Sequence, residues 1–340
     1  GYYRELPKLT DGPFAGFPRV FGIAWAYVAH TDSRFDADLL CSFVDAYQQV
    51  QPLTIGELWA IPITLRFVLV ENLRRAAVRI VASHSVRAEA DGYADRILGL
   101  DKSPPEPIAA VLEGRARPYP TTLVVQLAHR LRDPSPTVEP ALRWLEQQIV
   151  AEGRSIDAEV QSEHTRQAAM NVTVRNIITS MRQISAVDWP DLFERISCVD
   201  AMLRERTAFA EMDFPTRDNY RKRIEKLARR SPMDELAVTG KVIELAAAAA
   251  ARGEEARKHD PGYFLLAAGQ RELERNVGFR PSLRARRRRL SRPLGVGGYV
   301  AVCVGLAALV LAGVLALLSN QIDGVSPFLL VLIGLIAILP

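Results

Sequence analysis

The feature that most constrains this chain is an uncharged stretch of 26 residues, Leu294–Ser319, which directly follows a run of arginines. As a tilted helix, such a stretch is long enough to cross a hydrocarbon core of about 30 Å. A second apolar run, 325–340, follows a short polar loop and reaches the last residue. We therefore predict a transmembrane helix over 294–319 and a second, truncated one over 325–340. A buried helical hairpin of a soluble protein is the alternative.

The arginines indicate how this stretch is oriented. Basic residues beside a span remain in the cytoplasm, and the loop 320–324 carries no Lys or Arg. We predict a polybasic juxtamembrane segment over 280–293, residues 1–290 in the cytosol, and a lipid bilayer as partner. The membrane-orienting residues are Arg284, Arg286, Arg287, Arg288, Arg289 and Arg292.

The charge of the remaining chain argues against nucleic-acid binding. Residues 280–340 contain seven arginines, no lysine and one acid, which leaves 36 basic and 38 acidic residues in 1–279. A nucleic-acid-binding protein usually spreads its basic residues over one face of the domain. The three cysteines are far apart and show no C-x-x-C spacing, so neither a disulfide framework nor a zinc site is predicted.

The pattern of residues 1–279, ahead of the arginine run, predicts helices. Thr54 and Glu57 match a capping box, in which each side chain satisfies a free backbone N–H at a helix start. A long helical pattern follows, in which Pro62 predicts a kink and Gly92 a break. Residues 155–184 form an amphipathic pattern, and alternating β-branched runs are scarce. We predict an all-α cytosolic domain over 1–279, with a subdomain division near the prolines at 101–120.

Two short polar segments are the strongest chemical candidates. The loop at 30–36 contains His30, Asp32, Arg34 and Asp36, which suits either a catalytic loop or the capped start of a helix. Asp36 and Asp38 form a D-x-D, the pattern that holds a metal–nucleotide-sugar complex in many glycosyltransferases. No apolar strand precedes them, so we interpret them as acids in the first turn of a helix.

The second segment is 213–223, which mixes charges of both signs. It suits a solvated helix start with Thr216 as N-cap, or a docking surface for another domain. A further N-cap is predicted at Ser231. We predict no catalytic, metal or cofactor site within these 340 residues.

Longer phrases of the chain resemble a known family. They are GYYRELPKL (1–9), GPFAGFPRVFGIAWAYVAHTDSRFD (12–36), YQQVQPLTIGELWAIPITLRFVLVENLRR (47–75) and MDFPTRDNYR (212–221). They look like the region ahead of the membrane helices in bacterial cyclic β-1,2-glucan synthases. The resemblance implies a large multi-pass enzyme of the bacterial inner membrane, with a cytosolic glycosyltransferase that uses UDP-glucose, with or without a divalent metal. It also implies a phosphorylase-like region.

On this resemblance, the chain is an N-terminal scaffold and membrane-entry portion. Its partners would be the glycosyltransferase and phosphorylase-like domains of the same polypeptide, and the active sites would lie outside it. One alternative is an independent membrane-anchored helical adaptor or receptor without enzymatic activity. Another is a separate enzyme whose site is the loop at 30–36.

Overall fold

A computed structural model describes residues 6–100, 102, 104–132 and 138–281, together with 298, 300, 301, 303–310, 312 and 313. These residues form helices and no β-strand, so the predicted all-α class is confirmed for the described part of the chain. All six membrane-orienting arginines and the run 325–340 lie outside the described residues. The described positions of the predicted span 294–319 are helical. No helix within the described residues combines the length and apolarity needed to span a membrane.

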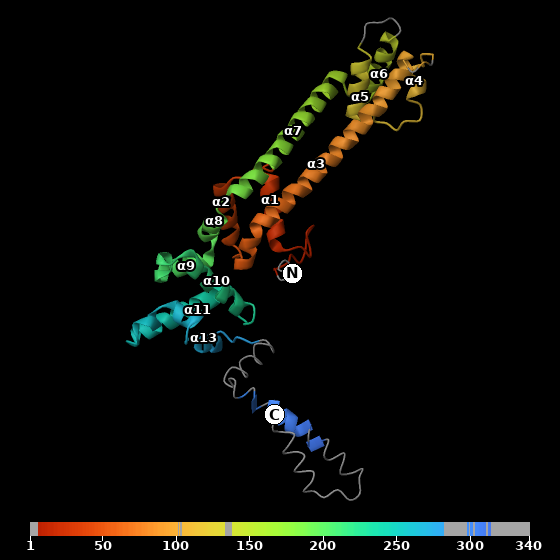
Figure 1. Ribbon diagram of the computed structural model, residues 1–340. Coiled ribbons are helices and arrows are strands. Elements are labelled where there is room, and N and C mark those ends of the chain that lie inside the picture. The colour runs from red at the N-terminus through yellow and green to blue at the C-terminus, as the bar shows by residue number, and fades with distance from the viewer. Residues whose placement is uncertain are drawn as a thin grey trace, which may run out of the picture.

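Two long antiparallel helices form the axis of the molecule (Figure 1). Helix α3 runs from Ile55 to Leu98 and α7 from Ile156 to Ala186. At 1.5 Å per residue, their lengths are about 66 Å and about 46 Å. Neither could remain helical over such a length by propensity alone, so packing against other elements at both ends stabilises them.

The larger body lies at one end of this axis, which we call the near end. It contains the start of α3, the end of α7 and most of the shorter helices, packed around one hydrophobic cluster. Those shorter elements are α1 (Arg19–His30), α2 (Ala37–Gln48), α8 (Trp189–Ile196), α9 (Cys198–Arg206), η2 (Ala208–Glu211), α10 (Phe214–Ala228), α11 (Glu235–Ala251), η3 (Ala256–His259), α12 (Pro261–Leu266) and α13 (Gln270–Asn276).

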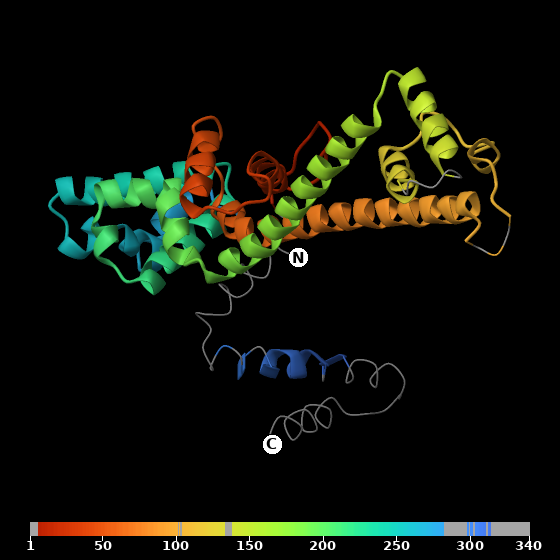
Figure 2. The ribbon, with the colours of Figure 1, turned by 90° about the horizontal axis from the view of Figure 1, so that it is seen from above.

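A second, smaller cluster lies at the far end. There α4 (Ile108–Val111), α5 (Thr121–Arg130) and α6 (Glu139–Ala151) pack on the far ends of the two long helices. Figure 2 shows α3 and α7 diverging toward this end, with α5 between them. Ile108 and Tyr119, from the proline-rich segment 101–120, belong to this second cluster. The subdomain division near 101–120 stays a prediction.

Helix α3 continues without interruption past Gly92, where a break was predicted, while the kink at Pro62 stays a prediction. Pro62 lies inside it, and loss of one backbone hydrogen bond there costs about 3 kcal/mol. On the same turns Ile61 and Leu65 are buried, and each such side chain stabilises by about 1.5–3 kcal/mol, so packing outweighs the loss. Gly92 costs only about 1 kcal/mol, and it lies between the fully buried Ala90 and Ala94.

Two predicted N-caps are wrong by a few residues. Helix α10 begins after Asp213, whose carboxylate accepts the Thr216 N–H at 3.2 Å, so Thr216 is inside the helix. Helix α11 begins after Asp234, which accepts the Ala237 N–H at 2.7 Å. In both cases the observed cap is an aspartate three residues away from the predicted cap residue. A charged acceptor forms the stronger hydrogen bond with the free backbone N–H.

Candidate functional site

The polar loop at 30–36 joins α1 to α2 and lies against both long helices. Asp32 and Ser33 adopt left-handed backbone conformations, with φ of 46° and 64°. Such conformations cost about 1–3 kcal/mol each in residues other than glycine. Hydrogen bonds from neighbouring helices must therefore hold them.

These hydrogen bonds come mainly from α7. The Ser180 hydroxyl donates to the Ser33 carbonyl at 2.7 Å and accepts the Phe35 N–H at 2.7 Å. Thr173 donates to the Asp32 carboxylate at 2.8 Å. From α3, the Asn72 amide donates to the Ser33 hydroxyl at 2.6 Å. The loop therefore joins α1 and α2 to both long helices, and polar groups of Asp32, Ser33 and Phe35 are bound by structural partners.

The remaining candidates of this loop are placed apart. His30 and Arg34 are exposed, while Asp36 caps α2 by accepting the Leu39 N–H at 2.9 Å. Asp38 of the D-x-D bonds to Arg195 at 2.8 Å. The two aspartates therefore serve different partners and do not fit a metal–nucleotide site. In the described part of the chain, no group of three or more His, Cys, Asp or Glu residues could hold a metal ion.

The predicted capping box is present at the start of α3 and does more than cap it. The Thr54 hydroxyl accepts the Glu57 N–H, and the Glu57 carboxylate accepts the Thr54 N–H. Glu57 is completely buried and also binds Arg19 of α1 through two hydrogen bonds, of 2.9 and 2.6 Å. One carboxylate thus satisfies a helix start and fixes the crossing of α1 over α3.

A second carboxylate reaches the same helix start from α11. Glu235 accepts the Ile55 N–H at 2.7 Å and is 8% exposed. Burial raises the pKa of Glu235 to about 7, with smaller contributions from the nearby carboxylates of Glu225 and Glu57. The contact between α3 and α11 therefore contains a group that titrates near neutral pH.

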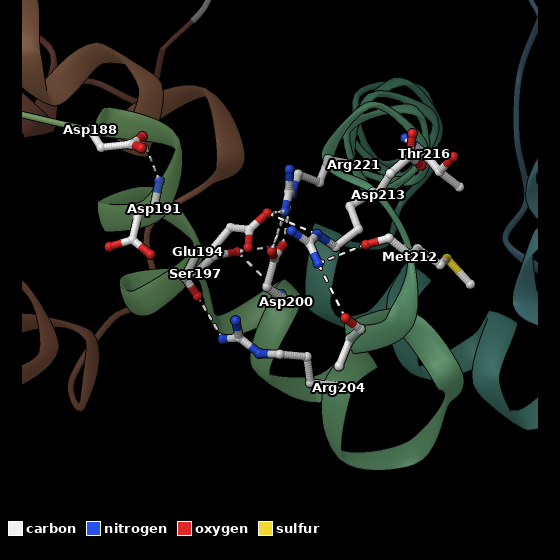
Figure 3. Close-up of polar contacts among 12 residues, drawn as sticks. Asp188, Asp191, Glu194, Ser197, Asp200, Arg204, Met212, Asp213, Thr216 and Arg221 are labelled. Atoms are coloured by element: carbon white, nitrogen blue, oxygen red, sulfur yellow. Dashed lines mark hydrogen bonds and ion pairs between the residues drawn. The ribbon is translucent and has the colours of Figure 1, made fainter.

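The segment 213–223 contributes to a buried ion cluster (Figure 3). Arg221 of α10 is fully buried and donates to Asp200 of α9 at 2.6 Å and to Glu194 of α8 at 2.6 Å. Its guanidinium carbon lies 5.1 Å from the ring centroids of Phe193 and Phe214, a cation–π arrangement. This part of the segment is therefore internal, contrary to the expectation of a solvated helix start, and it joins three helices.

An apolar surface on α3 is the feature that internal packing leaves unexplained. Ile63, Phe67, Val70, Val78 and Val81 are each between 52% and 68% exposed. Their spacing of three, four and eight residues places them on one side of the helix, over about 27 Å. We call these five residues the apolar face of α3.

The apolar face lies opposite the side of α3 that is already buried. Leu58, Ile61, Leu65 and Val68 point into the larger body and are at most 4% exposed. The first third of α3 is therefore apolar all round, a pattern typical of helices that are covered on every side. The exposed Phe17, whose ring lies 4.9 Å from that of Phe21, extends the apolar surface toward the N-terminal segment.

The charges around the apolar face are mostly positive. Arg66, Arg74 and Arg75 lie within or beside it, and Glu71 pairs with Arg74 and Arg75. A large apolar surface rimmed by charges is typical of a protein-interaction site. The sequence contains a sign of this surface, because Ile63, Phe67 and Val70 lie between the buried apolar residues of α3. Only the buried residues, however, show the helical spacing that predicts an apolar side.

The comparisons with known proteins agree with the resemblance of the longer phrases. Over 286 residues, 83% of its length, the chain is 39% identical to the cyclic beta-(1,2)-glucan synthase NdvB of Rhizobium meliloti (strain 1021). The chain belongs to the cyclic β-1,2-glucan synthase family. The match spans 10% of that relative's length, so this chain corresponds to about a tenth of a family member. No protein-family model matches the chain.

Glu235 predicts a pH-dependent stability. Its pKa is about 7 in the folded chain and 4.5 ordinarily, so the folded state binds more protons between these values. The free energy of unfolding should therefore fall by about 3 kcal/mol as the pH rises from about 4.5 to about 7. In Glu235→Gln the amide oxygen still accepts the Ile55 N–H, and this component should vanish. Urea unfolding at pH 5 and pH 8 measures it, with the exposed Glu244→Gln as control. Equal pH dependence in wild type and Glu235→Gln would contradict the assignment.

The Arg221 cluster predicts a strong coupling. Arg221→Leu leaves the buried carboxylate of Asp200 without its cation and should cost about 3–5 kcal/mol of unfolding free energy. Adding Asp200→Asn removes the stranded charge, so the double variant should be more stable than Arg221→Leu alone. Lys222→Leu, on the exposed side of α10, should change stability by less than about 1 kcal/mol. Additive losses in the double variant, measured in urea, would argue against a coupled ion cluster.

Proposed function

We propose that this chain is a structural segment of a cyclic β-1,2-glucan synthase, and that it holds the catalytic parts of the same polypeptide in position at the bacterial inner membrane. The observation that carries the proposal is the apolar face of α3. A family member is about ten times longer than the matched segment, so it contains ample further chain to cover this face.

The physical argument concerns the free energy of covering the face. Each half-exposed aliphatic side chain that a partner covers contributes about 1 kcal/mol. The face is presented on a continuous helix that is anchored in a core at each end, so little conformational entropy is lost when it is covered. The positive rim favours a partner surface that is apolar at its centre and acidic at its edge.

The remaining parts of the proposal follow from the family. We propose that the full-length protein transfers glucose from UDP-glucose, with or without a divalent metal, and that the glycosyltransferase and phosphorylase-like domains carry these steps. The polar clusters of the described residues support this division, because their charged groups are used in helix caps and ion pairs. The arginine run and the apolar segment after it would anchor the chain in the membrane, with residues 1–290 in the cytosol.

Removing the apolar face should separate its role from internal stability. We expect Val70→Gln, Val78→Gln and Val81→Gln together to change the stability of this chain by less than about 1 kcal/mol, because the three side chains are exposed. In the full-length synthase, the same triple variant should lower glucan synthesis in membranes supplied with UDP-glucose and expose α3 to protease. The control is Val150→Gln with Val172→Gln, which removes exposed valines elsewhere. Unchanged synthesis and unchanged protease resistance would refute the docking role.

The division of labour is tested by activity. The purified chain, incubated with radiolabelled UDP-glucose, should form no glucan and release no glucose, while the full-length synthase under the same conditions does both. Turnover by the chain alone would show that it contains an active site. Loss of that turnover in Asp32→Ala, with the fold retained by circular dichroism, would then locate the site in the loop at 30–36.

A further inference from the structure

A groove is lined by residues of α3, α5 and α7, at the end of the molecule where α5 lies between the two long helices (Figure 2). Its volume is about 590 Å³, within the range of small-molecule sites. Residues of all three helices line it, including Arg79 and Arg87 of α3, Pro120 and Thr122 at the start of α5, and Arg166 of α7. It lies on the side of α3 that faces α7, away from the apolar face.

The charged lining is dominated by cations. Arg79, Arg87 and Arg166 face the groove, and Glu163 is the one carboxylate among the residues that line it. His84 also lines it. A concave surface with this balance attracts anions, because the low-dielectric walls concentrate the field of the arginines.

Glu163 orients the arginines without exhausting them. It is 3% exposed and accepts hydrogen bonds from Arg87 at 2.9 Å, from Gln167 at 3.2 Å and from Arg166. Each guanidinium has five N–H donors, so most of those on Arg87 and Arg166 remain available to a ligand. Arg79 forms no ion pair with any residue in the described ranges. Arg87 and Arg166 are thus positioned before any anion arrives.

The start of α5 adds backbone donors at the same place. Pro120 is its N-cap, and no side chain caps this helix. The N–H groups of a free helix start carry partial positive charge and suit phosphate oxygens. Thr122, in this first turn, receives a hydrogen bond from Arg166 at 2.6 Å, so the helix start and the arginines form one surface.

The groove also has an apolar wall. Ile80 and Val86 of α3 and Met170 of α7 line it beside the cations. A bare inorganic anion would leave this wall uncovered, whereas a ligand with a phosphate and an apolar or ring-shaped part would cover both. Guanidinium forks match the planar pairs of oxygens that phosphates present.

We propose that this groove binds a phosphate-bearing anion that has an apolar part, held by Arg79, Arg87 and Arg166. Such a group occurs on a nucleoside diphosphate and on the headgroup of an anionic phospholipid. Both sources present the same chemistry to the arginines, and they differ in whether the ligand arrives from solution or from a lipid surface.

The variant Arg79→Gln tests the site without disturbing its frame. Arg79 is exposed and holds no described structural partner, so its loss should leave thermal unfolding unchanged. Loss of one charge-assisted hydrogen bond should weaken binding about ten-fold. The matched control is Arg175→Gln, which removes an exposed arginine from α7 outside the groove.

The measurement uses the full chain in neutral detergent and calorimetric titration with uridine diphosphate, adenosine diphosphate and pyrophosphate. A parallel arm measures co-sedimentation of the chain with vesicles of phosphatidylglycerol and of phosphatidylcholine. Binding of a nucleotide that weakens in Arg79→Gln and not in Arg175→Gln would support a ligand from solution. Co-sedimentation with phosphatidylglycerol that depends on Arg79 in the same way would support a lipid headgroup.

Two outcomes overturn the proposal. One is the absence of binding in both arms. The other is binding that Arg79→Gln and Arg175→Gln weaken equally, since that would reflect general charge. The arginine run at 284–292 is expected to attract anionic vesicles by itself, so only the difference between the two variants counts in the lipid arm.

Discussion

The buried carboxylate of Glu57 is the interaction on which the rest of the structure depends. It accepts the Thr54 N–H at the start of α3 and pairs with Arg19 of α1. A buried charge without such partners would be too costly to retain, since its desolvation amounts to several kcal/mol. Because the same carboxylate caps α3 and binds Arg19, it fixes both where α3 begins and how α1 crosses it. Every element farther along α3, up to the second cluster, takes its position from this start.

The long helices then transmit that position over several tens of ångströms. α3 carries a hydrophobic core at each end, and α7 returns antiparallel to it. The loop at 30–36 links the two helices near the body, and Glu163 with Arg87 links them near the far end. Because both contacts are hydrogen bonds made by buried side chains, Ser180 and Glu163, they resist separation of the helices. This stiffness is what makes the apolar face of α3 and the α3–α7 groove preformed surfaces.

Several local features could be predicted from sequence because their causes are local. Thr54 and Glu57 are three residues apart, so their reciprocal bonds need only one turn of helix. Asp36 caps α2 for the same reason. The break at Gly92 was wrong because its local cost of about 1 kcal/mol is smaller than the packing of the flanking residues, which only the folded chain reveals. The apolar face was missed because periodicity identifies one buried side of a helix and does not show that the other side is also apolar and exposed.

By itself, the sequence determined the all-helical class, the capped start of α3 and the family, since these depend on neighbouring residues or on similarity to a relative over most of the chain. Tertiary structure alone decided that Arg221 is buried among Asp200, Glu194 and aromatic rings, that Glu235 reaches the first turn of α3 from 180 residues away, and that Arg87 and Arg166 pair with Glu163. The physical reason is that burial and pairing between distant segments follow from how the helices cross, and one-dimensional spacing contains no record of those crossings.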